Sequence, residues 1–181
     1  MRRGSVEMIG SLDSKGNLRD VRKAVIISDT HASSIEDVPA AFRYVLKNVD
    51  LIIHAGDYTS KRLLDELQGS GIPFRGVYGN MDPRAVRDEL RAEEVLEIQG
   101  IKIGVAHPAE GGPPWGIERR LLSTFRGMNV IIYGHTHTVV NEVKGGITCI
   151  NPGSAMGKFP APYPSIAILK FPELRVEIHR T

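Results

Sequence analysis

The sequence predicts an α/β protein built on two sheets. Between residues 24 and 90, short runs of mostly β-branched apolar residues alternate with stretches in which apolar residues recur at helical spacing. This alternation is typical of a mainly parallel sheet that is covered by helices. Beyond residue 94, apolar runs follow one another in pairs across turns that contain glycine, which predicts a second sheet with more hairpins.

The first half is expected to contain three strands, each followed by a helix. Pro39 suits the first turn of the first helix, Gly69 the end of the second, and Asp82 the N-cap of the third. In chain order, the strands and helices are predicted at residues 24–27, 38–49, 51–53, 63–67, 73–78 and 83–90.

The second half is expected to contain three hairpins, one further strand and one helix. Gln99–Gly100 and Gly145–Gly146 are turn sequences between paired strands, and Gly127 ends the helix. In chain order, these elements are predicted at residues 95–98, 101–106, 117–125, 130–133, 139–143, 147–150, 165–171 and 174–179.

The chain of 181 residues is long enough for one domain with a sizeable core. We assign residues 23–181 to this domain. Residues 1–22 are polar and hold no ligand motif. They are expected to form an N-terminal extension that is either a hairpin of Val6–Ile9 with Leu18–Val21 or disordered.

Composition excludes several classes of protein. Lys and Arg total 23 against 21 Asp and Glu, so no basic block marks a nucleic-acid surface. The apolar runs are far too short to cross a membrane, and no secretion signal is recognised. The single cysteine, Cys149, is expected to be a buried small hydrophobe. These features favour a cytoplasmic location.

Two short blocks, at residues 28–31 and 134–137, are the strongest functional signal. Each places two ligand-type side chains two residues apart, and such residues point to the same side of an extended chain. Asp29 and His31 are therefore expected to converge on one metal ion. By the same argument, His135 and His137 can converge as well.

Further ligand types follow other apolar runs, in the segments Gly56-Asp57 and Gly79-Asn80-Met81-Asp82. Together with the histidines they form a mixed oxygen and nitrogen ligand set. Such a set suits Mn, Fe, Zn, Ni or Co better than Ca. His107, which follows the apolar run 101–106, is a further candidate ligand. The chain has only six histidines, and four of them, at 31, 107, 135 and 137, are candidate ligands.

These motifs, in this order, resemble those of the calcineurin-like metallophosphoesterases, from about residue 23 to the end. The resemblance is greatest to the small single-domain phosphodiesterase branch, which includes the retromer-subunit scaffold proteins. His54-Ala55-Gly56-Asp57 and Asn151-Pro152-Gly153-Ser154 add to it. It implies a four-layer α/β/β/α sandwich of two mixed sheets, with a dinuclear metal site at the carboxyl ends of the strands.

The resemblance also implies how two divalent ions are held, with manganese expected first and nickel, iron, cobalt or zinc as alternatives. Asp57 bridges the two ions. Asn80 and His107 orient the phosphate through the second ion. The ligands implied for the first ion are Asp29, His31, Asp57 and His137, and those for the second are Asp57, Asn80, His107 and His135.

Two positions depart from the family pattern. His107 is followed by Pro108 where relatives usually have glycine. Met81 stands where many relatives have a histidine that protonates the leaving group, although small members of the branch often lack it too. His54 and Asp82 are expected to support the ligands from behind. The alternatives are a hydrogen-bonded core histidine for His54 and a helix cap for Asp82.

The implied activity is hydrolysis of a small phosphodiester by a hydroxide that bridges the two ions. One alternative is a metal-binding interaction scaffold of the retromer-subunit type with little turnover. Another is a phosphomonoesterase or nuclease. The physiological substrate, the native metal and the formation of a homo-oligomer are left open by the sequence.

Two loops rich in glycine and proline, at 108–116 and 151–164, follow candidate site strands and are expected to shape substrate access. The first contains Trp115. We expect its ring to pack over the rim of the core, with stacking on a base or an aromatic leaving group as the alternative.

Overall fold

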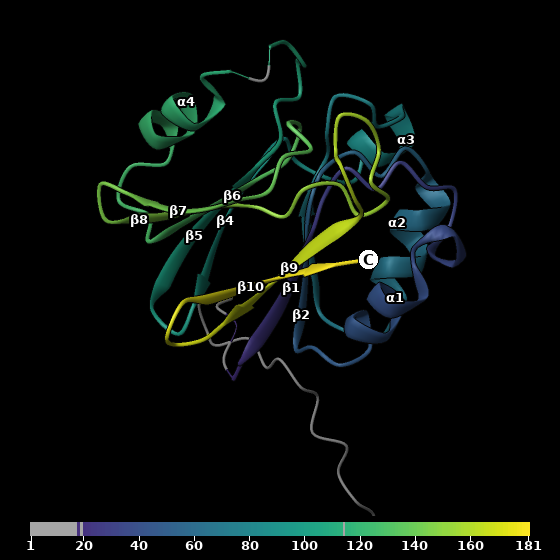
Figure 1. The fold of residues 1–181 in the computed structure, drawn as a ribbon, viewed down its shortest axis with the longest axis horizontal. Helices are drawn as coiled ribbons and strands as arrows, with labels where there is room; N and C mark the ends of the chain where they lie inside the picture. The colour runs from purple at the N-terminus through teal and green to yellow at the C-terminus, as the bar shows by residue number, and fades with distance from the viewer. Residues whose placement is uncertain (1–17, 19, 114) are drawn as a thin grey trace, which may run out of the picture.

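The computed structural model describes residues 18, 20–113 and 115–181. Two five-stranded sheets pack face to face, and short helices cover both outer faces (Figure 1). Helices α1, α2 and α3 lie on one side, and α4 lies on the other (Figure 1). The predicted α/β/β/α sandwich is therefore confirmed.

The first sheet has the strand order β10-β9-β1-β2-β3. Its centre is parallel, as the alternation of strands and helices predicts, and the C-terminal hairpin adds two antiparallel strands at one edge. The strands are β1 Lys23–Ile27, β2 Leu51–Ala55, β3 Phe74–Val77, β9 Ser165–Lys170 and β10 Arg175–Arg180.

The helices over this sheet are the short elements η1 Ile35–Asp37, α1 Ala40–Leu46, α2 Lys61–Gln68 and α3 Arg84–Arg87. Helix α2 buries a stripe of three leucines against the sheet and ends at Gly69, as predicted. No helix in the described ranges is long and apolar enough to cross a membrane.

Two predicted helix starts are wrong. Pro39 is the N-cap of α1 and has an extended backbone, so it lies before the first turn. Pro83 is the N-cap of α3, and the Asp82 carboxylate does not cap this helix but accepts hydrogen bonds from amides of its own loop and of the loop after β2. Both helices are also shorter than the apolar spacing predicts.

The second sheet has the order β4-β5-β6-β8-β7, with α4 Ile117–Thr124 on its outer face. The two predicted hairpins are present, and β6 pairs in parallel with both β5 and β8. Its strands are β4 Glu93–Ile98, β5 Ile101–Ala106, β6 Val130–Tyr133, β7 Val140–Lys144 and β8 Ile147–Asn151.

The main core lies between the two sheets. Ile26 and Ile53 of the first sheet meet Ile103, Val105 and Ile132 of the second in one fully buried cluster. Cys149 is buried in a smaller cluster beneath α4, as predicted. This packing fixes the two sheets relative to each other, and so aligns the ends of their strands.

The predicted extension lies largely outside the described residues, since 1–17 and 19 are not described. Leu18 and Val21 are both buried in the main core, and the Leu18 amide donates a hydrogen bond to the Glu97 carbonyl at 3.3 Å. Pairing of this segment with Val6–Ile9 stays a prediction.

Two valine truncations test the position of the core. Val105 is fully buried between the sheets, whereas Val143 on edge strand β7 is 71% exposed. We expect Val105→Ala to lower the free energy of unfolding by about 2 kcal/mol, because it removes apolar contacts and leaves a cavity. The matched Val143→Ala is expected to change it by less than about 0.5 kcal/mol. Urea denaturation measures both, and equal losses would contradict this core.

Candidate metal centre

The seven predicted ligands all follow strands that end at the same edge of the sandwich. Asp29 and His31 come after β1, and Asp57 comes after β2. The others follow neighbouring strands of both sheets, namely Asn80 after β3, His107 after β5, and His135 and His137 after β6. The carboxyl ends of the parallel strands therefore bring all seven predicted ligands to one place.

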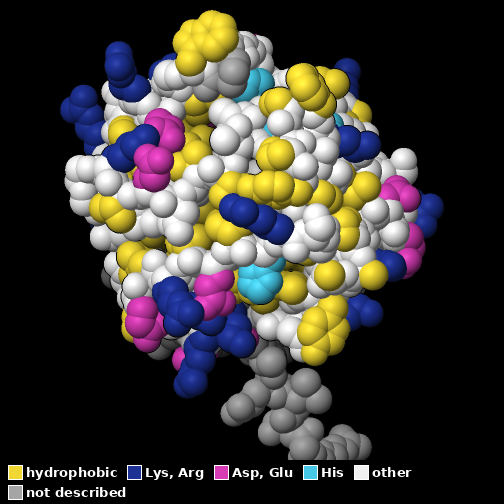
Figure 2. Space-filling view, viewed as in Figure 1, with side chains coloured by type: hydrophobic (Ala, Val, Ile, Leu, Met, Phe, Trp, Pro, Cys, Tyr) yellow, Lys and Arg dark blue, Asp and Glu magenta, His cyan; other side chains and the backbone are white. Residues whose placement is uncertain are grey.

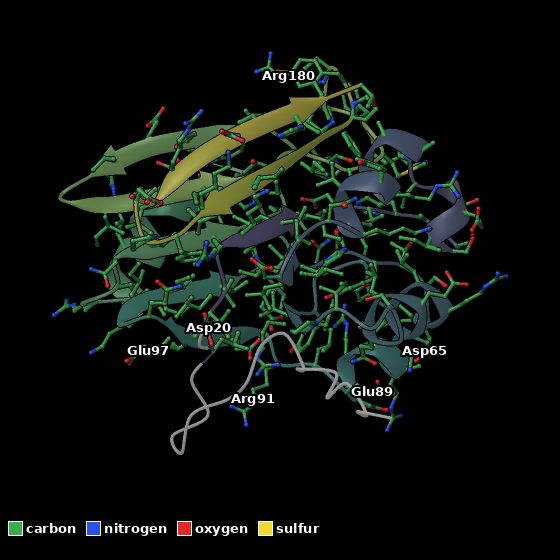
Figure 3. All side chains as sticks on the ribbon, turned by 90° about the horizontal axis from the view of Figure 1, so that it is seen from below. Asp20, Asp65, Glu89, Arg91, Glu97 and Arg180 are labelled. Atoms are coloured by element: carbon green, nitrogen blue, oxygen red, sulfur yellow. The ribbon has the colours of Figure 1, made fainter. Side chains whose placement is uncertain are left out.

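Burial distinguishes the two predicted carboxylate ligands, Asp29 and Asp57, from charged residues at the surface. Figure 3 shows Asp65, Glu89 and Arg180 pointing outward from the helical layer and the sheet edge. Asp29 and Asp57, in contrast, are 0% and 2% exposed. Carboxylates that are buried to this degree need charged partners, because desolvation of an isolated ion costs several kcal/mol.

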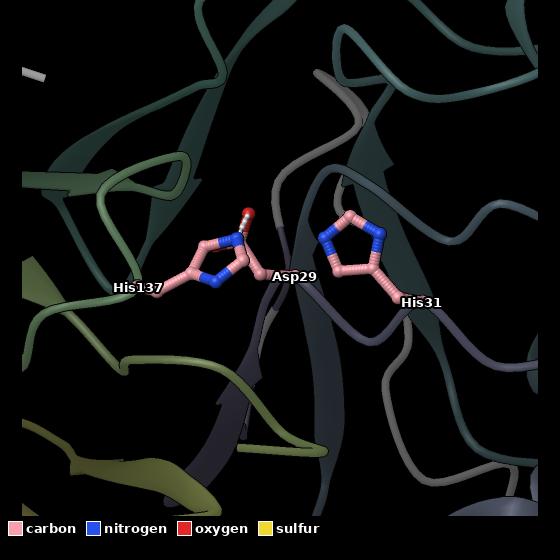
Figure 4. A group of neighbouring side chains, drawn as sticks. All are labelled: Asp29, His31 and His137. Carbon is pink, nitrogen blue, oxygen red and sulfur yellow. Dashed lines mark ion pairs between the residues drawn. The ribbon is translucent and has the colours of Figure 1, made fainter. Parts of the chain in front are cut away.

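A first cluster consists of Asp29, His31 and His137 (Figure 4). The potential ligand atoms of these three residues lie within 4.8 Å of one another. His137 Nε2 is 3.2 Å from Asp29 Oδ1, and the rings of His31 and His137 are 5.3 Å apart. This set corresponds to three of the four ligands implied for the first ion.

A second cluster consists of Asp29, Asp57 and His107, also within 4.8 Å. His107 Nε2 lies 3.2 Å from Asp29 Oδ1 and 3.7 Å from Asp57 Oδ2. The same Asp57 oxygen is 3.7 Å from His31 Nε2. Asp57 thus lies between imidazoles that belong to the two implied ion sites, while Asp29 is common to both clusters.

His135 and Asn80 form a separate pair at the exposed side of the centre. His135 Nε2 lies 2.9 Å from the Gly112 carbonyl, which can only accept, so this nitrogen carries the proton. In a neutral ring Nδ1 then has a lone pair, and it faces Asn80 Oδ1 at 2.9 Å. This contact is satisfied by a metal ion, by a second proton on the ring, or by rotation of the Asn80 amide so that its NH2 group donates.

His137 shows the same arrangement. Its Nδ1 donates to the Lys158 carbonyl at 2.8 Å, which leaves Nε2 directed at Asp29. A histidine that binds a metal commonly donates its other N–H to a carbonyl in this way. In addition, His31 Nε2 and His107 Nδ1 are buried and have no hydrogen-bond partner among the described residues. The donor set therefore fits divalent metal ions.

The charges of the centre are coupled through Asp29. Burial by itself raises the pKa of Asp29, but hydrogen bonds with His107 and His137 hold it well below its usual value. Burial opposes the charged forms of these two imidazoles, yet contact with Asp29 raises the pKa of both. Protons and metal ions therefore compete for the same nitrogen lone pairs.

We expected the ligands to converge because side chains alternate along an extended chain, but the backbone at these residues is not extended. Five predicted ligands have left-handed backbones, with φ values of 49° at Asp29, 45° at His31, 60° at Asp57, 80° at His135 and 55° at His137. The loops turn sharply at these residues. Asp29 and His31 still meet, but His135 and His137 separate, one toward Asn80 and the other toward Asp29. Such conformations cost of order 1–3 kcal/mol each and are typical of functional sites.

Two glycines allow the loops to approach this closely. A Cβ atom on Gly79 would lie 2.1 Å from Asp57 Oδ1, and one on Gly134 would lie 2.1 Å from Ser28 Oγ. Any larger residue would displace the ligand loops. The glycines that precede Asn80 and His135 are therefore part of the construction of the site.

Asp82 supports the centre from behind. Its carboxylate accepts hydrogen bonds from the backbone amides of Asp57 at 3.0 Å, Thr59 at 2.7 Å and Gly79 at 2.8 Å. Burial nevertheless raises the pKa of Asp82. These bonds tie the loop after β2 to the loop after β3.

His54 has the contacts of a hydrogen-bonded core histidine. Its Nδ1 accepts from the Gly56 amide at 3.1 Å, so Nε2 donates to Thr30 Oγ1 at 2.8 Å. The ring stacks on Tyr58, and burial lowers the pKa of His54 to about 3, so it is neutral. His54 therefore contacts Thr30 and Gly56, which lie next to Asp29 and Asp57, and does not contact the two carboxylates themselves.

Several supporting residues were missed by the sequence argument. Ser28 Oγ donates to Asp29 Oδ2 at 2.6 Å, and Ser154 Oγ donates to the Asp29 carbonyl at 2.7 Å. Arg87 donates to the carbonyls of Asn80 and Asp82 at 2.7 and 2.8 Å. Ser154 lies in the Asn-Pro-Gly-Ser segment that resembles the family, whereas nothing in the local sequence marks Arg87.

Trp115 is 75% exposed, so the expectation that it packs over the core rim is wrong. The loop that carries it also has a role that was not predicted, because its Gly112 carbonyl orients His135. The second loop does the same for His137 through Lys158. Both loops therefore hold the ligands as well as bordering the site.

The fold and the donor set define a metal-binding α/β/β/α sandwich protein. The family model described as the calcineurin-like phosphoesterase superfamily domain matches residues 23–173. The chain belongs to this superfamily, as its motifs predict. A probable metallophosphoesterase of Methanocaldococcus jannaschii is 41% identical over 131 residues, which cover 71% of this chain and 66%, just under two thirds, of that protein.

Solved structures show the same fold. An archaeal phosphodiesterase has a TM-score of 0.67 and 25% identity, over 88% of this chain and 99% of its own. A single-substitution variant of Vps29, the retromer subunit, from Entamoeba histolytica has a TM-score of 0.65 and 25% identity, over 88% of this chain and 98% of its own.

Substitution of Asp82 tests the support of the ligand loops. We expect Asp82→Asn to weaken Mn²⁺ binding at least tenfold, because an amide group cannot accept all three backbone hydrogen bonds. The free energy of unfolding is expected to fall by roughly 1–3 kcal/mol. Calorimetric titration and urea denaturation measure these effects. Asp88→Asn, at an exposed position on the same segment, serves as the control, and equal Mn²⁺ affinity in both variants would contradict the role of Asp82.

Proposed function

We propose that this protein is a phosphodiesterase that requires two divalent ions, with Mn²⁺ preferred, and hydrolyses a small phosphodiester. The observation that carries the proposal is the convergence of seven nitrogen and oxygen ligand residues on one edge, where ring nitrogens face carboxylate and amide oxygens. Membership of the phosphoesterase superfamily and similarity to an archaeal phosphodiesterase support it.

The ligand division follows the family pattern. Asp29, His31, Asp57 and His137 would hold one ion, and Asp57, Asn80, His107 and His135 the other. The equal distances of 3.7 Å from Asp57 Oδ2 to His31 and His107 support a shared Asp57. When bound, two such ions supply Lewis acidity and neutralise the charge of the phosphate.

The nucleophile is expected to be water, because the nearby hydroxyl groups are engaged elsewhere. Ser28 and Ser154 are buried and donate to Asp29, and Thr30 is hydrogen-bonded to His54. None of these three side chains is free to attack a phosphate. Asn80 and His107 would orient the phosphate through the second ion.

The leaving group receives no proton from position 81. Met81 is 59% exposed beside Asn80, and its thioether cannot act as an acid. Help from a general acid is typically worth 10²–10⁴-fold, so alkyl esters, whose alcohols have a high pKa, should react slowly. Aryl phosphodiesters are therefore the expected best substrates.

The first test is hydrolysis of a nitrophenyl phosphodiester by Mn²⁺-loaded protein. We expect release of nitrophenol that stops on chelation and returns when Mn²⁺ is restored. Asp57→Asn should reduce the rate by at least about 10³-fold, because it weakens both ion sites at once. Asp65→Asn, an exposed change on α2, is the control. If the wild-type protein releases no nitrophenol with Mn²⁺, Ni²⁺, Co²⁺ or Fe²⁺, the proposal is wrong.

A second test introduces the absent proton donor. Met81→His should accelerate hydrolysis of an alkyl phosphodiester by about tenfold or more and leave the aryl substrate nearly unchanged. Met81→Gln, which is polar but cannot donate as an acid, should show neither gain. Rates with both substrates and all three proteins measure this. An equal gain with Gln would show that polarity rather than acidity is responsible.

The similarity to Vps29 supports an alternative, an interaction scaffold that binds metal with little turnover. Metal stoichiometry measured together with turnover distinguishes the two. Tight binding of two ions without hydrolysis of aryl monoesters, aryl diesters or cyclic nucleotides would favour the scaffold. Faster hydrolysis of the monoester than of the diester would identify a phosphomonoesterase.

A further inference from the structure

A groove of about 720 Å³ borders the metal centre on the side of α4. Its walls come from α4, from β7 and from the loop that carries Trp115. Thr136, which lies between His135 and His137, belongs to the same wall. The groove therefore reaches the ligand loop at Thr136, next to the candidate metal centre.

Three polar side chains of the groove, Tyr133, Glu118 and Lys144, are paired, and Arg119, Thr136 and Thr138 also line it. The Tyr133 hydroxyl donates to Glu118 at 2.6 Å, and Glu118 also pairs with Lys144. Lys144 has a second carboxylate partner in Glu142 at 3.1 Å. With these groups paired, what the groove offers a ligand is largely apolar surface, from Trp115, Leu122, Val140 and Pro160.

Large apolar side chains stand exposed around the same edge. Trp115 borders the groove, and Phe159, which is 93% exposed, follows the Lys158 carbonyl that orients His137. Figure 2 shows apolar side chains on both sides of a histidine at the top of the view. Exposed apolar surface beside a polar site is typical of a ligand-binding groove.

We propose that this groove is a substrate subsite that binds an uncharged apolar group, an aryl ring above all, on the phosphodiester. This inference rests on the proposed function. The volume lies in the range of sites for small molecules, roughly 300–1,000 Å³, and far exceeds a methyl group. Trp115 would stack on the ring, and Leu122 and Val140 would contact its edge.

The bound group is the one that stays on the product. Met81 precedes α3, and α3 and α4 lie in opposite outer layers (Figure 1). The resemblance implies that a histidine at position 81 protonates the leaving group in many relatives, which would place the leaving group on the α3 side. Water adds its oxygen to phosphorus, the bond to the departing oxygen breaks, and one proton passes to solvent. The remaining monoester keeps the group in the groove.

Two substrates with the same leaving group test the subsite, namely phenyl 4-nitrophenyl phosphate and methyl 4-nitrophenyl phosphate. The ratio of their kcat/KM values, phenyl over methyl, is compared between the wild type and two variants. Trp115→Ala and Leu122→Asn should each lower this ratio about tenfold, mainly through KM of the phenyl substrate. Differences in intrinsic reactivity cancel in this comparison.

Tyr44→Ala is the matched control, because Tyr44 is 71% exposed on α1, in the opposite outer layer. It should leave the ratio unchanged. An unchanged ratio in both groove variants, with both substrates turned over, would overturn the subsite and leave the phosphodiesterase activity intact.

Binding can be followed without turnover, because Trp115 is the only tryptophan of the chain. At constant Mn²⁺, phenylphosphonate should shift or quench its fluorescence, and methylphosphonate should not. If neither diester is hydrolysed but phenylphosphonate alone changes the emission, the proposed function fails and the subsite stands. No hydrolysis together with no change in emission would overturn both.

Discussion

The structure depends on the environment of one buried carboxylate, that of Asp29. It lies at the end of β1, contacts His107 and His137 from the second sheet, and accepts hydrogen bonds from Ser28 and from the His135 amide. A buried charge without such partners would cost several kcal/mol, so the two sheets must stay in register around it. The apolar core between the sheets supplies the rigid support for this alignment.

Several residues at the same edge of the molecule have backbone conformations that lower the stability of the folded state. Left-handed backbones at Asp29, Asp57 and His135 are unfavourable for residues with a side chain, and glycines at 79 and 134 permit contacts that no other residue would allow. Asp82 counteracts this strain by holding three backbone amides of the ligand loops. The strain is therefore confined to loops that rigid strands and one buried acid hold in place.

The sequence predicts the layers correctly, and the seven predicted ligands lie at one edge, because strands and ligand motifs both depend on the order of residue types. Apolar runs such as 24–27 and 51–53 correspond to buried strands, and the ligand motifs follow them. The contacts of Asp82 are harder to predict from the sequence. An aspartate before a proline is typical of a helix cap, and this pattern does not indicate which amides the carboxylate binds. The separation of His135 from His137 depends on the backbone angles of a loop, and residue spacing does not encode those angles. The carbonyls of Gly112 and Lys158 are backbone atoms, which leave no signature in the sequence.

The contacts made by these two carbonyls affect which positions of the loops can be substituted. Because His135 and His137 are oriented by main-chain oxygens, no particular side chain is needed at position 158 for this purpose, whereas the φ of 101° at Gly112 favours glycine there. Substitution of the exposed Lys158 side chain would therefore leave the orientation of His137 intact. In this loop, the contact that holds the imidazole and the side chain that faces solvent belong to different atoms of one residue.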